Sequence, residues 1–187
     1  MLNRTQAFDA LTRLLTQVAG DAPAAVLVVR LQRLREIELA FGYEAAEMLC
    51  GEFERRLQAL LRAGDVHLRT GESDLLVLLP DLRGRAHAAL AAAKIVRALQ
   101  APFDTTAGTV HPLVVVGIAL CPEDGETSEL LCRRADRACD EAAGHVERLA
   151  FWRAPAIPVE AVQQALRTAI TDHQLQLHLQ PIQRLAD

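Results

Sequence analysis

Three short apolar runs most constrain what this chain can fold into. They read AAVLVVRL at 24–31, LLVLL at 75–79 and HPLVVVGIAL at 111–120. Runs of this length, rich in Val and Leu, are typical of buried strands in one sheet. The chain is 51% apolar but only 4% aromatic, so Leu, Val and Ala must fill the core.

Between these runs, apolar residues recur at helical spacing. A polar turn joins a strand at 66–70 to the run at 75–79 as a hairpin, and a last strand is expected at 147–152. Helices are expected at 5–19, at 33–63 with an interruption near Gly42, at 83–101, and at 127–143 with Thr127 or Ser128 as its cap. The resulting order predicts an α/β fold, with a mixed central sheet and a ferredoxin-like βαββαβ core flanked by helices.

A boundary is expected after residue 152. Residues 1–152 form the predicted first domain, and the proline-containing stretch 153–158 is the linker. Residues 159–187 then carry one helix, with an apolar face at Val162, Leu166 and Ile170, and one alternating strand. Because a lone helix and strand cannot bury a core, this segment is interpreted as the start of another domain.

Charge and cysteine usage narrow the function classes. The net charge is -4 without a block of like charge, so neither nucleic acid nor a membrane surface is an expected partner. No apolar run approaches the roughly 18 residues that span a bilayer, and the N-terminus lacks a signal peptide, so a cytoplasmic location is expected. Four cysteines without CxxC spacing and scattered histidines indicate reduced core thiols and no metal site.

Several strings, in the right order, resemble the GGDEF family of diguanylate cyclases, enzymes that join two GTP molecules into cyclic di-GMP. They are LNRTQAF at 2–8, RTGESDLLVLLP at 69–80, VVVGIALCPEDG at 114–125 and LLCRRADRACDEA at 130–142. The family forms of the second and fourth are RxGGDEFxxLLP and LLxxADxALYxA. The tail, LRTAITDHQLQLHLQPI, resembles the opening of the EAL phosphodiesterase domain, which often follows GGDEF. The resemblance implies a nucleotide cyclase-like fold and a downstream EAL domain as partner.

The hairpin turn departs from the family pattern. Gly71 keeps the first glycine, but Glu72 replaces the second; Ser73, Asp74 and Leu75 then stand where the family has Asp, Glu and Phe. The family's glycines let the backbone approach nucleotide phosphates, and its acidic residues hold two Mg²⁺ ions. Asp74 alone remains as a possible ligand, so the turn is interpreted as degenerate.

Other positions that the resemblance marks as functional also differ. Arg30 stands where the family has a metal-binding Asp, and Glu38 where it has the guanine-recognising Asn. Glu47 partly replaces an Asp, Ala143 replaces a phosphate-binding Lys, and Arg35 keeps a positive charge. No catalytic residue, no Mg²⁺ and no cyclase activity are therefore expected.

The string RAGD at 62–65 lies five residues before Gly71. It resembles the inhibitory RxxD site at which many cyclases bind cyclic di-GMP, with Arg62 and Asp65 as ligand-binding residues. The same residues also suit a helix end, with Gly64 at the C-cap and Asp65 opening a turn. The sequence leaves both interpretations open.

The favoured function is a catalytically inactive regulatory module that couples to a downstream EAL domain through docking, homodimerisation or cyclic di-GMP binding. A sensor that binds GTP or cyclic di-GMP, a residual cyclase and a ligand-free scaffold are the alternatives. Arg30 and Glu72 argue against the residual cyclase.

Overall fold

The computed structural model describes residues 9, 11–13, 15, 23–106, 108–155, 159–172 and 174. The chain divides into two compact units, Met1–Trp152 and Arg153–Asp187. Each unit is described by itself.

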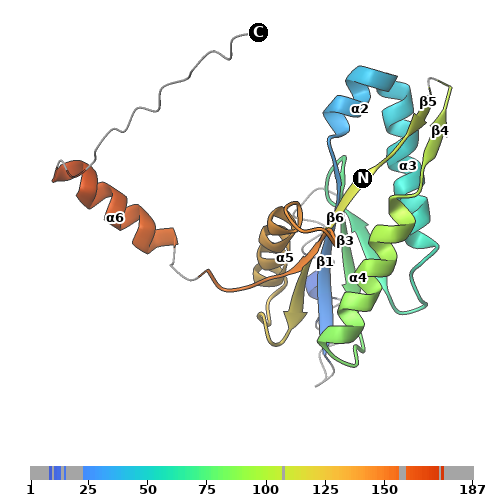
Figure 1. Ribbon diagram of the computed structural model, residues 1–187. Helices are drawn as coiled ribbons and strands as arrows, with labels where there is room; N and C mark the ends of the chain where they lie inside the picture. The colour runs from blue at the N-terminus through green and yellow to red at the C-terminus, as the bar shows by residue number, and fades with distance from the viewer. Residues whose placement is uncertain are drawn as a thin grey trace, which may run out of the picture. The chain divides into compact units, whose positions relative to one another are not determined.

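A five-stranded sheet forms the centre of the first unit, in the order β2-β3-β1-β6-β7 (Figure 1). The β6–β7 pair is parallel and every other pair is antiparallel. This order confirms the predicted mixed sheet and its ferredoxin-like core, including the hairpin of β2 and β3. The strands are β1 (Ala24–Gln32), β2 (Val66–Arg69), β3 (Asp74–Leu79), β6 (Leu113–Cys121) and β7 (Leu149–Phe151).

The helices predicted at 33–63, 83–101 and 127–143 are present with adjusted ends, whereas most of the helix predicted at 5–19 lies outside the described residues. Gly42, at φ 87°, separates two helices in the region where one interrupted helix was expected. Thr127 is the cap of α5, because its hydroxyl accepts a hydrogen bond from Leu130 N at 3.3 Å. Among the described residues of the first unit, the helices are α2 (Leu34–Phe41), α3 (Tyr43–Gln58), α4 (Arg85–Leu99) and α5 (Ser128–Ala142).

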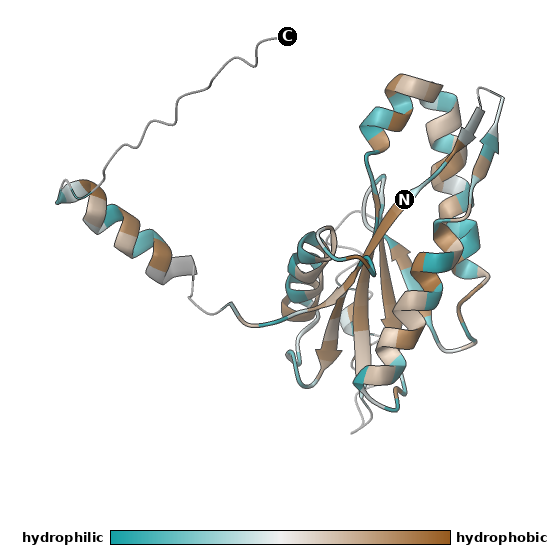
Figure 2. Cartoon of the chain, viewed as in Figure 1, coloured by the Kyte–Doolittle hydropathy of each residue, from teal (hydrophilic) through white to brown (hydrophobic). Residues whose placement is uncertain are grey.

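Alternation along the strands divides the core into two layers. In β1, Leu27 and Val29 pack with the helices α2, α3 and α4 on one face of the sheet. Val26 and Val28 pack with α5 on the other face. Figure 2 shows the central strands as the most hydrophobic part of this unit. Because the side-chain period of a strand is two, both faces of such a buried sheet need apolar residues.

A second, small hairpin follows α4 and was not predicted. It consists of β4 (Phe103–Thr105) and β5 (Gly108–Val110). Polar bonds support it: the Thr105 hydroxyl donates to Gly108 O at 2.7 Å, and the Thr109 hydroxyl donates to the Asp104 carboxylate at 2.8 Å. Three-residue strands with polar, exposed residues carry little of the apolar alternation that reveals longer strands.

The helix α5 lies directly on β6 at Gly117. A Cβ atom at this position would lie 2.0 Å from Ala135 O and 2.2 Å from Cys139 N. Only a glycine leaves room for the helix backbone here, so Gly117 sets how closely α5 approaches the sheet.

The second unit contains α6 (Val159–Thr171). Its side chains Val162, Leu166 and Ile170 are 51%, 52% and 54% exposed, on the face that the sequence predicts to be apolar. The strand predicted to follow this helix falls outside the described residues, apart from Gln174. In the part of the chain that the structure describes, no helix is both long and apolar enough to cross a membrane.

Replacing Gly117 by Ala is expected to lower the free energy of unfolding by about 3 kcal/mol, because the new methyl group collides with the backbone of α5. Urea denaturation measures the change. Gly51→Ala is the matched control: an added Cβ meets nothing within 4 Å there, and Ala in the helix α3 should stabilise by about 0.5 to 1 kcal/mol. A loss below about 1 kcal/mol for Gly117→Ala would contradict the close approach.

Candidate functional site

The turn between β2 and β3 is held by an arginine of β2. Arg69 Nε donates to Gly71 O at 3.1 Å, and its Nη2 donates to Glu72 O at 3.2 Å. From β1, Leu31 N donates to Ser73 O at 2.9 Å. The carbonyl groups of the turn are thus bonded within the protein, and the turn has a defined conformation.

Arg30, on β1, lies opposite Asp74 of β3 in the strand register. Its guanidinium contacts three carboxylates: Asp74 at 2.8 Å, Asp136 at 2.6 Å and Asp140 at 2.8 Å. The two latter residues belong to α5. The side chain of Arg30 is only 24% exposed, so this centre is half-buried. We call these four residues the Arg30 centre.

The electrostatics of the Arg30 centre favour a permanent positive charge. The hydrogen bond to Asp74 is the largest cause that raises the pKa of Arg30 above its ordinary value, and desolvation opposes it. Next to it, burial raises the pKa of the Cys139 thiol to about 12. Cys139 is therefore a neutral thiol at physiological pH. All four cysteines carry thiols rather than disulfides.

A guanidinium at this place opposes a metal ion. A divalent cation about 4 Å from Arg30 would meet a repulsion of about 2 kcal/mol in water and more in a half-buried place. The carboxylate of Asp74, the one ligand candidate left in the turn, already accepts two hydrogen bonds from Arg30, at 2.8 and 3.3 Å. Within the described ranges, no group of three or more His, Cys, Asp or Glu side chains is arranged to hold a metal ion.

A cavity of about 320 Å³ lies beside the turn, between it and the helices α2 and α3. Glu38, Glu47 and Glu72 line it, together with Arg69. Arg35 does not line the cavity, and it donates to two lining side chains, the Glu38 carboxylate and the Tyr43 hydroxyl, each at 3.0 Å. Three carboxylates against one arginine make this cavity unfavourable for a triphosphate.

A second cavity, of about 330 Å³, includes Arg62 and Asp65. The Asp65 carboxylate accepts a hydrogen bond from Arg62 N at 2.8 Å and is only 6% exposed, whereas the Arg62 side chain is 58% exposed. Asp65 therefore closes a turn after α3, but the helix ends earlier than the helix-end interpretation expected: its last residue is Gln58 and its C-cap is Ala59, not Gly64. Arg62 remains accessible, and His87 and Lys94 of α4 line the same cavity.

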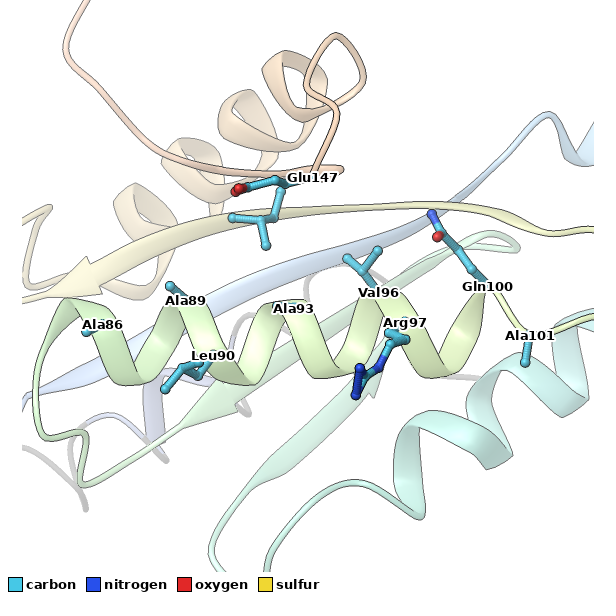
Figure 3. A pocket seen from close by; sticks show the side chains of 10 residues that line it. Ala86, Ala89, Leu90, Ala93, Val96, Arg97, Gln100, Ala101 and Glu147 are labelled. Atoms are coloured by element: carbon cyan, nitrogen blue, oxygen red, sulfur yellow. The ribbon is translucent and has the colours of Figure 1, made fainter.

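A third cavity, of about 780 Å³, runs along α4 (Figure 3). Its wall consists mainly of small apolar side chains, with Arg97, Gln100 and Glu147 as the polar exceptions. Figure 3 shows Arg97 and Glu147 on different elements of the wall. No cluster of charged groups converges here, so this groove is not the candidate site.

The sequence identified Arg30, Asp74 and the turn, and the structure brings Arg30 and Asp74 together. Sequence reasoning missed Asp136, Asp140 and Arg69 as partners. One signal was available: in the family string LLxxADxALYxA, Asp140 stands where the family has Tyr, and an acidic residue there differs from the family pattern. His87 and Lys94 carried no signal, because their helix is distant in sequence from RAGD.

Comparisons with known proteins identify the family to which this fold belongs. The family model described as "Diguanylate cyclase, GGDEF domain" matches residues 1–147. The bifunctional diguanylate cyclase/cyclic di-GMP phosphodiesterase MucR of Pseudomonas aeruginosa is 31% identical over 96% of this chain and 27% of its own length. The cyclic di-GMP phosphodiesterase NbdA of the same organism is 29% identical over 87% of this chain and 21% of its own.

Among solved structures, the GGDEF domain of TpbB (YfiN) from Pseudomonas aeruginosa matches with a TM-score of 0.76 at 28% identity, covering 83% of this chain and 98% of that one. The chain belongs to the GGDEF family of diguanylate cyclase domains. The chain spans about a quarter of the length of MucR and NbdA.

Replacing Arg30 by Ala is expected to lower the free energy of unfolding by about 2 kcal/mol, because three carboxylates then lose their shared cation. Chemical denaturation gives the value. Arg55→Ala is the control, since its ion pair with Glu52 is exposed and Arg56 also holds Glu52; a change within about 0.5 kcal/mol is expected there. Equal effects of the two variants would show that the Arg30 centre contributes no more than a surface pair.

Proposed function

We propose that the first unit is a catalytically inactive GGDEF-type regulatory module of a cyclic di-GMP signalling protein. The observation that carries the proposal is the Arg30 centre. In it, a guanidinium is bound by Asp74 and by two carboxylates of α5 at 2.6 to 2.8 Å.

Cyclase chemistry is a phosphoryl transfer that needs metal ions to neutralise the reacting phosphates. In this chain the carboxylates of Asp74, Asp136 and Asp140 neutralise Arg30 instead. A fixed +1 charge can replace a metal ion in holding the carboxylates, but it has no open coordination positions for a nucleophile or a phosphate oxygen. The Arg30 centre thus supports the fold without supporting the reaction.

The neighbouring cavity supports the same proposal. Glu38, Glu47 and Glu72 would repel a triphosphate, and Arg69 is occupied by the turn and by Glu54 at 3.5 Å. At the C-cap of α5, Ala143 offers no charge to a phosphate. The residues present do not fit the two Mg²⁺ ions that the family uses.

The purified protein is expected to make no cyclic di-GMP from GTP with Mg²⁺ or Mn²⁺, and to give no heat of GTP binding by calorimetry. The GGDEF domain of TpbB, which belongs to a protein named as a diguanylate cyclase, serves as the positive control. Cyclic di-GMP detected by chromatography above a no-enzyme blank would overturn the proposal. An altered rate in Arg30→Ala would show that this activity belongs to the protein and not to a contaminant.

A second candidate function, a cyclic di-GMP sensor, is favoured by one observation. Three basic or titratable side chains, Arg62, His87 and Lys94, surround the cavity of about 330 Å³. Arginine and lysine bind phosphate diesters readily, and Arg62 is exposed enough to do so. Asp65 opposes this candidate, because binding through its carboxylate would require it to leave the turn bond to Arg62 N.

If the sensor function holds, calorimetry with cyclic di-GMP should show binding that Arg62→Ala and Lys94→Ala each weaken by about tenfold or more. Arg55→Ala, on the exposed part of α3, should leave the affinity unchanged. Binding that is insensitive to Arg62→Ala refutes the site. The absence of any binding supports a purely structural role for Arg62 and Asp65, in the turn after α3.

The second unit is proposed to begin an EAL-type domain that this module regulates. The similarity to MucR supports this, because it covers 96% of the chain and so continues past residue 147, where the GGDEF match ends. The exposed apolar face of α6 also suits a helix that packs against further protein. A cytoplasmic location and pairing with a second copy are part of the same proposal.

A further inference from the structure

Two consecutive aromatic residues end the first unit, and an arginine stacks on each. Arg85 Cζ lies 4.0 Å from the centre of the Phe151 ring, and Arg134 Cζ lies 3.9 Å from the centre of the Trp152 ring. The backbone is fixed as well, because Trp152 N donates to Ile118 O at 2.8 Å. Stacking at this distance is a favourable cation–π contact. The last residues before the second unit are therefore held from two helices, α4 and α5.

Both arginines also bind the turn after β6. Arg85 pairs with Glu123 at 3.3 Å, and Arg134 Nη1 donates to Asp124 O. This turn is itself rigid, because the Asp124 carboxylate is buried and accepts from Leu120 N at 2.7 Å. Arg134 thus joins α5, the turn and Trp152.

Two different interactions hold the helix α5, ion pairs on one side and a cation–π stack on the other. Asp136 and Asp140 hold Arg30 on the side of β1 and β3, whereas Arg134 stacks on Trp152 beside β7. In the sheet, β1 and β7 are separated by β6. Between these two interactions the backbone of α5 rests on Gly117 of β6, with no room for a Cβ atom.

A helix supported closely at one place and held on both flanks can tilt about that place. We propose that α5 is a lever that pivots on Gly117 and couples the Arg30 centre to Trp152, at the exit of the first unit. Arg30 keeps its charge at all physiological pH values, so a change of pH does not free the lever, whereas loss of the contacts of Arg30 or of Arg134 does. The coupling is a property of the fold and goes beyond the proposed function, since it does not depend on whether a nucleotide binds.

Trp152 is the single tryptophan of the chain, so its fluorescence reports on this place alone. Arg134→Met removes the guanidinium but keeps an unbranched stem, and it should raise the acrylamide quenching constant of Trp152 about twofold. Arg30→Met should also raise the quenching, although Arg30 lies on the far side of β6. Arg133→Met, an exposed neighbour on α5, is the matched control and should leave quenching unchanged.

The double variant of Arg30 and Arg134 tests the coupling itself. Because both changes release the same helix, the combined rise in quenching should be smaller than the sum of the two single effects. If Arg30→Met alters quenching no more than Arg133→Met does, the lever is refuted and only a local stack remains. If Arg134→Met has no effect, the stack is refuted as well.

Circular dichroism and urea denaturation establish that each variant is folded at the temperature of the quenching measurement. Should Arg30→Met not fold, Asp140→Asn replaces it, since Asp140 is 71% exposed and two carboxylates remain on Arg30. The same outcomes then apply: increased quenching supports the lever and unchanged quenching overturns it. Calorimetry with GTP tests the proposed function separately, so either proposal can fail alone.

Discussion

The ion pairs of Arg30 are the interaction on which the functional part of this structure depends. A single guanidinium joins the middle strand of the sheet, the strand that carries the family's signature turn, and the helix on the opposite face from the cavities. Its three carboxylate partners are at positions 74, 136 and 140, so these ion pairs join residues that are far apart in the sequence. Removing the cation would leave carboxylates facing one another in a half-buried place, which is costly. A charge that belongs to the protein thus occupies the space between the signature turn and α5.

The structure separates what maintains the family fold from what performs the family reaction. The fold depends on alternating apolar residues in β1, β3 and β6, and on the close contact of α5 with Gly117. The reaction depends on charge at a few positions around one turn. The charged groups of the Arg30 centre lie at partly exposed positions and pair with one another, so they do not interrupt the buried alternation. A GGDEF domain can therefore keep its architecture, with a TM-score of 0.76 to the TpbB domain, while its candidate site carries a different electrostatic pattern.

Much of the architecture was predictable because the signal is local. Val-rich runs indicated the strands, Gly42 marked the break between α2 and α3, and Thr127 supplied a cap whose hydroxyl bonds the first turn of α5. The hairpin of β4 and β5 was not predictable, since its polar three-residue strands show no periodicity. The candidate site was half predictable: resemblance pointed to Arg30, Asp74 and Arg62, but not to the helix residues Asp136, Asp140 and Lys94 that complete the two clusters.

The amino-acid sequence alone was enough to predict the fold class, the order of the elements and the family, and it drew attention to Arg30 through the resemblance. Those conclusions follow from the period of apolar residues and from short strings, which involve neighbours along the chain. The tertiary structure was needed to show that Arg30 pairs with three carboxylates. It was also needed to show that Asp65 closes a turn next to an exposed Arg62, and that α5 packs on Gly117 between its contacts with Arg30 and Trp152. The physical reason is that each of these depends on distances between side chains or backbone atoms from separate elements. Those distances are set when the helices pack on the sheet, and no local pattern records them.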